Sequence, residues 1–207
     1  VNNDPRIIYV GAASGGIWKS ENAGTTFEPV FDDHIQSIGA IAVDQEHPDT
    51  VWAGTGEPWT RNSVSVGDGI YKTTDGGDKW KNMGLEETER IGRIAINPEN
   101  PNIVYVAALG HLWGPNEERG VFRTTDGGKT WEKVLYINEN TGCSDIALDP
   151  EDPDIIYAGM WNFRRKPHFF RSGGEGSGLY VSRDGGESWD RVDIDIATGM
   201  LGRVAVA

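Results

Sequence analysis

The chain has 207 residues, with 32 acidic and 19 basic side chains, a formal net charge of −13 and a single cysteine, Cys143. This length suits one domain or a part of a larger one, and the acidic balance argues against nucleic-acid binding, which normally needs a basic face. The apolar runs are too short for a helix that inserts into a membrane, and one cysteine excludes an internal disulfide framework.

The composition favours an all-β fold. Glycine accounts for 28 residues, about twice its usual share, and there are 8 tryptophans. Glycines supply turns and tryptophans supply buried area, while the apolar runs have the length of short strands. No amphipathic stretch reaches the length of a useful helix.

Four short segment types recur along the chain in a fixed order, and we name them strands A to D. Strand A is of the Ile-Ala-Val type, strand B of the Ile-Val-Tyr type, and strand C of the Gly-Ile-Tyr-Lys-Thr type, while strand D begins at the aromatic residue after a Gly-rich turn. A period of about 50 residues with four strands matches a β-propeller blade. In chain order the pattern predicts one domain over 1–207, with blades at about 6–30 (strands B to D only), 37–83, 90–134 and 143–192, and a lone strand A at 202–207.

The turn between strands C and D has a physical logic. Asp75, Asp126 and Asp184 each precede two glycines at this turn. Their short carboxylates can accept hydrogen bonds from the N–H groups of the turn, and the glycines permit a positive φ. In the first copy Asn22 replaces the aspartate and Phe27 replaces the closing tryptophan. We assign Asn22, Asp75, Asp126 and Asp184 a structural role and no catalytic role.

The recurring segment Ser/Thr-x-Asp-x-Gly-x-Thr/Ser-Trp resembles the Asp-box, or BNR repeat, with three good copies that end at Trp80, Trp131 and Trp189. This repeat is typical of sialidases, xyloglucan-cleaving glycoside hydrolases and the Vps10/sortilin ectodomain. The chain looks most similar to exported bacterial proteins of the "glycosyl hydrolase, BNR repeat" or sortilin-like type. The resemblance implies a secreted, periplasmic or cell-surface location, Asp-boxes on the face opposite the usual active site, and a propeller of six or more blades.

The blade count leaves two arrangements open. The first predicted blade lacks strand A, and the chain ends on a strand A. The chain therefore fits either a closed ring of four blades or a part of a larger ring that joins other domains. The resemblance favours the larger ring.

Loops that join strands B and C are the candidates for ligand binding. They cover 55–68, 108–119 and 160–177, which is long for connections inside a compact domain. Their aromatic rings suit the apolar faces of sugars, and their arginines suit hydroxyl or carboxylate groups. The alternative is that the rings pack the loops onto the rim. The candidate contacts for a peptide, protein or glycan ligand are Trp59, Arg61, His111, Trp113, Arg119, Trp161, Arg164 and Arg165.

Three functions stay open at this point: a binding module, a glycoside hydrolase, and a purely structural propeller. A hydrolase needs two carboxylates on either side of the glycosidic bond, and the sialidase segment Phe/Tyr-Arg-Ile-Pro is absent from the sequence. The four histidines are scattered without ligand spacing, so we expect no metal and no cofactor. The candidate catalytic acids are Asp145, Glu57, Asp68, Glu117 and Glu118.

The start of strand A carries a charge pattern. Alignment of the four copies places Ala40, Arg93, Asp145 and Arg203 at one equivalent position. Asp145 is then expected between two arginines of adjacent blades. The arrangement indicates either an ion network that ties the blades together or a charged floor for the ligand site.

Overall fold

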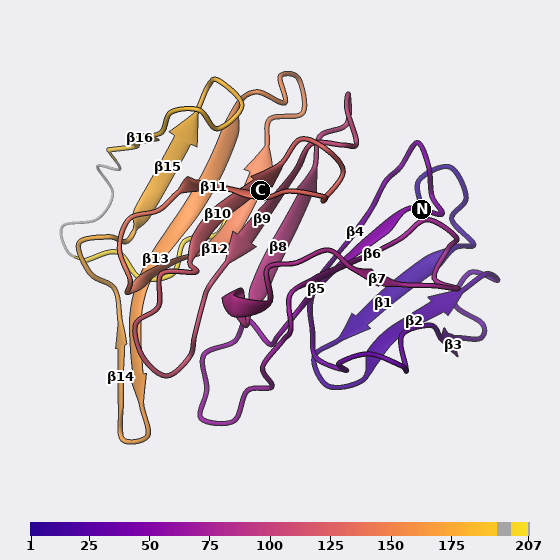
Figure 1. The fold of residues 1–207 in the computed structure, drawn as a ribbon, viewed down its shortest axis with the longest axis horizontal. Coiled ribbons are helices and arrows are strands. Elements are labelled where there is room, and N and C mark those ends of the chain that lie inside the picture. Colours follow the sequence, from indigo (N-terminus) through magenta and orange to yellow (C-terminus); the bar gives the residue numbers. More distant parts are fainter. Residues whose placement is uncertain (194–199, 207) are drawn as a thin grey trace.

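The computed structural model describes residues 1–193 and 200–206, which form an arc of four antiparallel sheets (Figure 1). The strand order is β1-β2-β3 in the first sheet, β4-β5-β6-β7 in the second, β8-β9-β10-β11 in the third and β12-β13-β15-β16 in the fourth, where β14 also pairs with β13. Each sheet is one blade, and the chain is an all-β propeller. No helix within the described residues is long and apolar enough to cross a membrane.

The blades follow one another in chain order: the first has strands B to D, the second and third have strands A to D in succession, and in the fourth β14 comes between strands B and C. The bounds are β1 Ile8–Ala12, β2 Gly16–Ser20, β3 Glu28–Pro29, β4 Ile38–Val43, β5 Val51–Thr55, β6 Ile70–Thr73, β7 Lys81–Asn82, β8 Ile91–Ile96, β9 Val104–Ala108, β10 Gly120–Thr124, β11 Glu132–Leu135, β12 Thr141–Leu148, β13 Ile156–Lys166, β14 Phe169–Ser172, β15 Gly178–Ser182 and β16 Asp190–Arg191. Among the described residues, one 3-10 turn, Glu86–Thr88, lies between β7 and β8.

In the second and third blades strand B forms the buried centre, because it has a strand on either side and a neighbouring blade on either face. Every residue of β5 and of β9 is buried. Apolar cores fill the three junctions between blades, and tryptophans of the Asp-boxes close them: Trp80 at the first junction, Trp131 at the second and Trp189 at the third. The blades are therefore joined face to face by apolar packing.

The Asp-boxes have the expected hydrogen bonds. In the third blade the Thr124 hydroxyl donates to Asp126 Oδ1 at 2.8 Å and accepts from the N–H of Gly128 at 2.9 Å. Asp126 also accepts from the N–H groups of Lys129 and Thr130, at 2.9 and 3.0 Å. The same bonds recur around Asp75 and Asp184, and Asn22 makes a partial set. These bonds lower the pKa values of Asp75, Asp126 and Asp184.

Each Asp-box is also fastened to the blade before it. The indole N–H of Trp80 donates to the carbonyl of Val30, and that of Trp131 donates to the carbonyl of Met83, both at 2.8 Å. In the opposite direction, side chains of the preceding blade donate to the carbonyl of the first box glycine. These donor–acceptor pairs are Tyr9–Gly76, Lys72–Gly127 and Tyr105–Gly185.

The last described segment, 200–206, lies against the fourth blade and not against the first. The Ser144 hydroxyl donates to the carbonyl of Val204 at 2.8 Å, and the N–H of Val206 donates to Asp145 Oδ2 at 3.1 Å. The segment occupies the place of a following strand A, but residues 202–206 are assigned to no strand, and Ala207 lies outside the described residues. Because β1 pairs with β2 alone among the described strands and the arc in Figure 1 is open, the closed four-bladed ring is not the observed arrangement.

Candidate functional site

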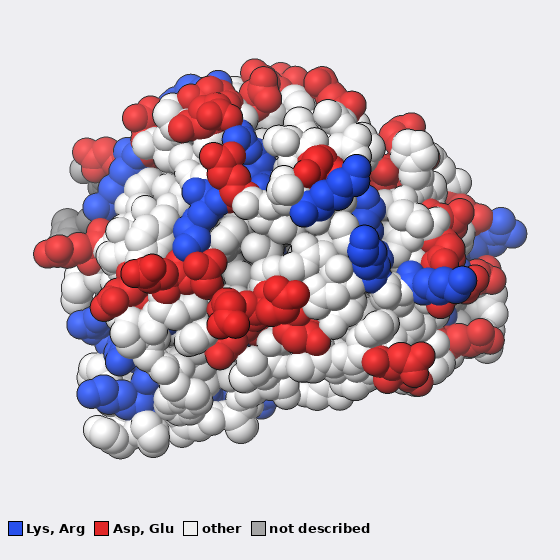
Figure 2. All heavy atoms as spheres, viewed as in Figure 1, with Lys and Arg blue, Asp and Glu red and all other residues white. Residues whose placement is uncertain are grey.

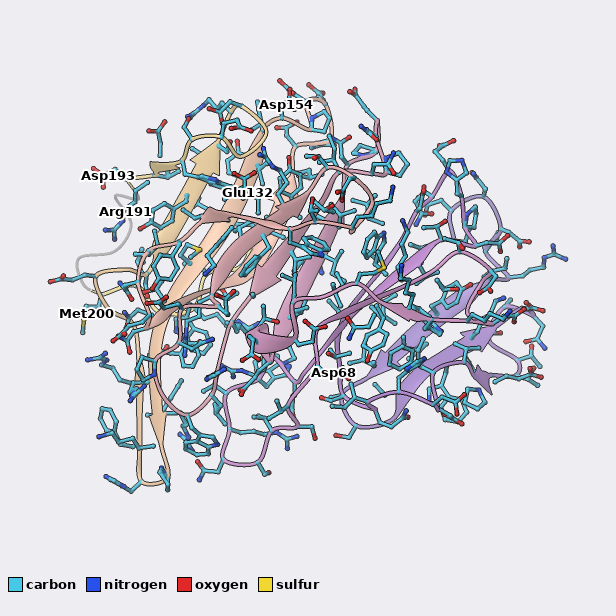
Figure 3. All side chains as sticks on the ribbon, viewed as in Figure 1. Asp68, Glu132, Asp154, Arg191, Asp193 and Met200 are labelled. Atoms are coloured by element: carbon cyan, nitrogen blue, oxygen red, sulfur yellow. The ribbon has the colours of Figure 1, made fainter. Side chains whose placement is uncertain are left out.

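The connections between strands B and C gather at one end of the blades, which is the lower end in Figure 1. We call this end the B–C face. Figure 3 shows Asp68, where the second-blade loop enters β6, toward this end, and Asp154, in an A–B turn, at the opposite end. The Asp-boxes share the end of Asp154, since Gly185 donates its N–H to the carbonyl of that residue. The two faces are therefore distinct, as expected.

The third of these connections is not a loop. The sequence predicts an irregular segment over 160–177, but β13 continues to Lys166 and pairs with β14 in a hairpin. In this hairpin Phe163 lies opposite Ser172, and Arg165 lies opposite Phe170. Backbone pairing replaces the side-chain core that a long loop would need, so the hairpin can project from the blade.

The second-blade loop is fixed by an ion pair. Arg61 makes two hydrogen bonds to the Glu57 carboxylate, at 2.7 and 2.9 Å, and the Glu57 side chain is buried. Gly56 has a φ of 88° and its Cα faces the Glu89 carbonyl so closely that a Cβ would clash. The loop leaves Trp59 65% exposed. Arg61 and Glu57 therefore hold the loop, and Trp59 is the side chain that it presents.

The third-blade loop is held by two buried arginines. Arg119 donates from Nε to Asn116 Oδ1 at 2.7 Å and from Nη2 to the carbonyls of His111 and Gly114. Arg90, which precedes β8, donates to the carbonyls of Gly110 and His111. Arg119 was a predicted ligand contact; it is 1% exposed, and its Nε and Nη2 bond to the loop itself.

The two buried guanidinium groups flank the hairpin of the fourth blade. The guanidinium carbons of Arg90 and Arg119 lie 5.1 and 4.9 Å from the ring centroid of Phe163. Burial lowers the pKa of Arg90 to about 9 and that of Arg119 to about 10, and a neighbouring arginine contributes to each shift. Both groups stay charged at neutral pH, so cation–π contacts join the third-blade loop to the fourth blade.

Trp161 also belongs to this packing. It is 4% exposed, forms a small core with Leu109 and Phe163, and donates its indole N–H to the Ser172 hydroxyl at 3.0 Å. The alternative that the rings pack the loops onto the rim therefore describes Trp161, whereas Trp113 is 49% exposed on the third-blade loop. The two tryptophans were expected to act alike and differ in exposure because Trp161 sits on a strand that faces the neighbouring blade.

The hairpin and the second-blade loop meet across the third blade. Arg165 donates from Nε to Asn62 Oδ1 at 2.8 Å, and Asn62 donates to the carbonyl of Pro167 at 3.4 Å. Arg165 also lies over the ring of Phe170 at 5.4 Å. Arg164 is half-buried beside this contact. The sequence did not indicate Asn62 as the partner, because the two segments are about a hundred residues apart.

Arg203 completes the B–C face. Its guanidinium carbon lies 4.8 Å from the ring of Trp59 and 5.7 Å from the ring of Trp161. Asp145 pairs with Arg93 across 3.6 Å, as expected, and takes its second partner from the backbone of Val206. Of the two predicted arginine neighbours of Asp145, Arg93 forms the ion pair and Arg203 stacks on Trp59 of the B–C face.

Most of the candidate catalytic acids have partners within the protein. Glu57 is bound by Arg61, and Asp68 accepts from the Tyr71 hydroxyl at 2.7 Å and from Thr55 at 3.3 Å. Lys133 pairs with Glu118 at 3.1 Å. Glu117 is exposed. His111, a predicted ligand contact, has its Nε2 3.3 Å from a Glu89 carboxylate oxygen.

Comparison with known proteins connects the chain to three groups. The family model Sortilin-Vps10, described as "Sortilin, neurotensin receptor 3,", matches residues 68–201. The xyloglucanase Xgh74A of Acetivibrio thermocellus is 26% identical over 218 residues and covers 92% of this chain, which in turn spans 24% of that enzyme. The photosystem II assembly lipoprotein Ycf48 of Synechococcus sp. (strain CC9605) is 27% identical over 178 residues, covering 85% of this chain and 43% of its own length.

A solved structure agrees in fold. The GH74 enzyme of Niastella koreensis superposes with a TM-score of 0.67 at 21% identity, over 91% of this chain and 28% of that one. At this identity the likeness establishes the β-propeller fold alone. The chain spans about a fifth to a quarter of the length of the xyloglucanases that it matches.

Proposed function

Because the chain belongs to the Sortilin-Vps10 family, we propose that it is a ligand-binding β-propeller module whose ligand, an extended glycan, lies on the B–C face. The observation that carries this proposal is the separation of two kinds of aromatic side chain. Trp161 and Phe163 are buried in the rim, whereas Trp59 and Trp113 stand exposed on two adjacent loops. Exposed rings on well-fixed loops suit stacking against the apolar faces of sugars.

The surroundings of these rings support the same ligand class. Arg203 stacks on Trp59, and Arg165 is held in place by Asn62. Both guanidinium groups retain N–H donors suited to hydroxyl groups of a sugar. The relatives that bear the name xyloglucanase add support for a glycan over a peptide or protein ligand. The name of the Ycf48 relatives, a lipoprotein, supports an exported location.

The test is binding of xyloglucan oligosaccharides to the protein, measured by isothermal titration calorimetry, with an acidic and a neutral peptide as the other ligand class. We expect Trp59→Ala and Trp113→Ala each to weaken binding by about tenfold, which is the loss of one stacking contact together with its buried area. Phe27→Ala is the matched control, because Phe27 is a similarly exposed ring on the Asp-box end. If a peptide binds and no glycan does, the proposed ligand class is wrong. If all three variants lose affinity equally, the ligand does not lie on the B–C face.

Glycoside hydrolysis is the second candidate, and the names of the relatives favour it. It needs two carboxylates about 5–5.5 Å apart for retention or about 6.5–9.5 Å apart for inversion. Glu117 is exposed on the third-blade loop, and Asp145 lies in the middle of β12, paired with Arg93. Release of reducing ends from xyloglucan, abolished by Asp145→Asn in a protein of normal melting temperature, identifies an enzyme. Binding without such release identifies a binding module.

A further inference from the structure

A second surface of the molecule gathers positive charge away from the B–C face. Lys72 on β6, Lys81 on β7, and Lys79 and Lys129 of two Asp-box turns line a hollow of about 380 Å³. We call it the lysine groove. It lies between the second and third blades and contains four of the seven lysines of the chain. In Figure 2 blue atoms gather over β6 and β7, with acidic side chains on the surface around them.

These four lysines lack the carboxylate partners that two other lysines of the chain have. Among the described residues no carboxylate forms an ion pair with any of the four, whereas Lys19 pairs with Glu21 at 2.8 Å and Lys133 pairs with Glu118 at 3.1 Å. Acidic side chains outnumber basic ones by 32 to 19, so partners are plentiful elsewhere. Cations of like sign around one hollow create a local positive potential that attracts an anion.

The nearest carboxylate of the groove is already engaged. Asp75 accepts from the Thr73 hydroxyl at 2.6 Å and from the N–H of Lys79 at 2.9 Å, as its turn requires. Asp44, which acts on Lys72 from the A–B turn, accepts from the N–H groups of Glu46 and His47. Asp75 is the one carboxylate among the lining residues of the groove, against four ammonium groups, so the lining keeps a net positive charge.

Lys72 forms the floor of the groove. It is half-buried, donates to the carbonyl of Gly127 at 3.3 Å and lies 4.6 Å from the ring centroid of Trp52. Burial lowers the pKa of Lys72, Asp44 raises it, and Lys129 lowers it further. A half-buried ammonium with a second cation nearby is stabilised by an anion that enters the hollow.

From this geometry we propose that the lysine groove binds a short anionic oligosaccharide, one that carries carboxylate or sulfate groups on its sugar rings. Trp80 and Met83 supply the apolar lining that a sugar ring needs, and the lysines surround it. Ammonium groups are point charges on flexible stems, so they suit charges that are spread along a chain rather than one planar carboxylate. The volume falls within the range of ligand pockets. The net charge of −13 disfavours long polyanions and anionic membranes.

The test uses a trisaccharide of galacturonic acid, with maltotriose as the neutral ligand and triglutamate as the acidic peptide. Binding is measured by calorimetry at low and at moderate salt. Of the three ligands we expect only the trisaccharide of galacturonic acid to bind, and its affinity should fall as the salt concentration rises. The double variant Lys81→Ala/Lys129→Ala should weaken this binding by about two- to thirtyfold, the loss of two exposed charge contacts.

The matched control is Arg6→Ala/Arg183→Ala, which removes the same two charges from exposed residues of the first and fourth blades. It should leave the affinity unchanged. No binding to the wild-type protein, equal losses in both double variants, or binding of triglutamate as tight as that of the sugar acid overturns the proposal. Trp59→Ala separates the two sites, since it should weaken xyloglucan binding and leave the lysine groove unaffected.

Discussion

Replacing Thr124 with valine removes one hydroxyl from the Asp-box of the third blade and little else. Thr124 is 1% exposed at the end of β10, and valine keeps its branched shape. The hydroxyl accepts from the N–H of Gly128 and donates to Asp126. The variant therefore leaves no cavity and acts through hydrogen bonds alone.

The expected loss follows from the buried donor. The hydrogen bond to Gly128 is buried, and Gly128 is packed so closely against the Trp52 ring that a Cβ would approach it to 2.6 Å. Water therefore has no room to replace the hydroxyl. A buried N–H without a partner destabilises a protein by about 1–3 kcal/mol. For a chain of this size that corresponds to a fall of about 2–12 °C in melting temperature.

Urea denaturation measures this difference. The midpoint should fall while the slope m stays constant, because the surface exposed on unfolding is the same. Thr125→Val is the control, since Thr125 is the exposed next residue and undergoes the same chemical change. If Thr124→Val has the midpoint of the wild-type protein, the hydroxyl does not hold the turn and the structural account of the Asp-box is wrong.

Three further outcomes are expected. Hydrogen bonds from Ser188 and Ser182 lower the pKa of Asp184 from 3.8 to about 2. The stabilisation that ionised Asp184 provides is therefore complete above about pH 4 and is lost as the pH falls toward 2. Between pH 5 and pH 2 the urea midpoint should fall less steeply in Asp184→Asn than in the wild-type protein, and parallel curves contradict this. Burial raises the pKa of the Cys143 thiol well above its usual range, so a thiol reagent should label it only at the rate of unfolding. Fast labelling of the native protein would show that Cys143 is not a buried, unreactive thiol. Trp161→Ala should lower the free energy of unfolding by about 3–5 kcal/mol, against less than about 0.5 kcal/mol for the exposed Trp113→Ala, as measured by denaturation of both.

The blades were readable from the sequence because each is a local unit. A strand of fixed type recurs at each step of the period, and the Asp-box bonds join residues no more than four positions apart. Even the start of strand A was aligned correctly: irregularities between Ile91 and Arg93 and between Cys143 and Asp145 place the two charged residues at equivalent points. Local hydrogen bonding leaves a periodic pattern that needs no knowledge of the fold.

The arrangement of the B–C face was harder to predict from the sequence because its contacts are not local. Burial of Trp161 depends on Leu109 of the neighbouring blade, and the place of Arg165 depends on Asn62 two blades away. One short signal was available: aromatic and polar residues alternate from Trp161 to Arg164, which is the period of a strand. That alternation predicts that strand B continues past Met160, as β13 does, but it does not predict β14.

The lysine groove illustrates the same limit. Lys72 and Lys129 belong to different blades and come together only because an Asp-box docks on the preceding blade. No spacing in the sequence brings them into one group. A sequence period identifies the blades, whereas the junctions between blades create surfaces that no single period contains.

The fastening of each Asp-box to the preceding blade has a consequence for how the molecule unfolds. The bonds from Tyr9 to Gly76 and from Tyr105 to Gly185 join adjacent blades, as do the indole bonds of the boxes. Coupling of this kind makes the array a one-dimensional, nearest-neighbour system, whose stability is a sum of blade energies and junction energies. The second and third blades each share two junctions, and the first shares one. Amide exchange should therefore be slowest in β5 and β9, and opening should spread inward from the outer blades one junction at a time.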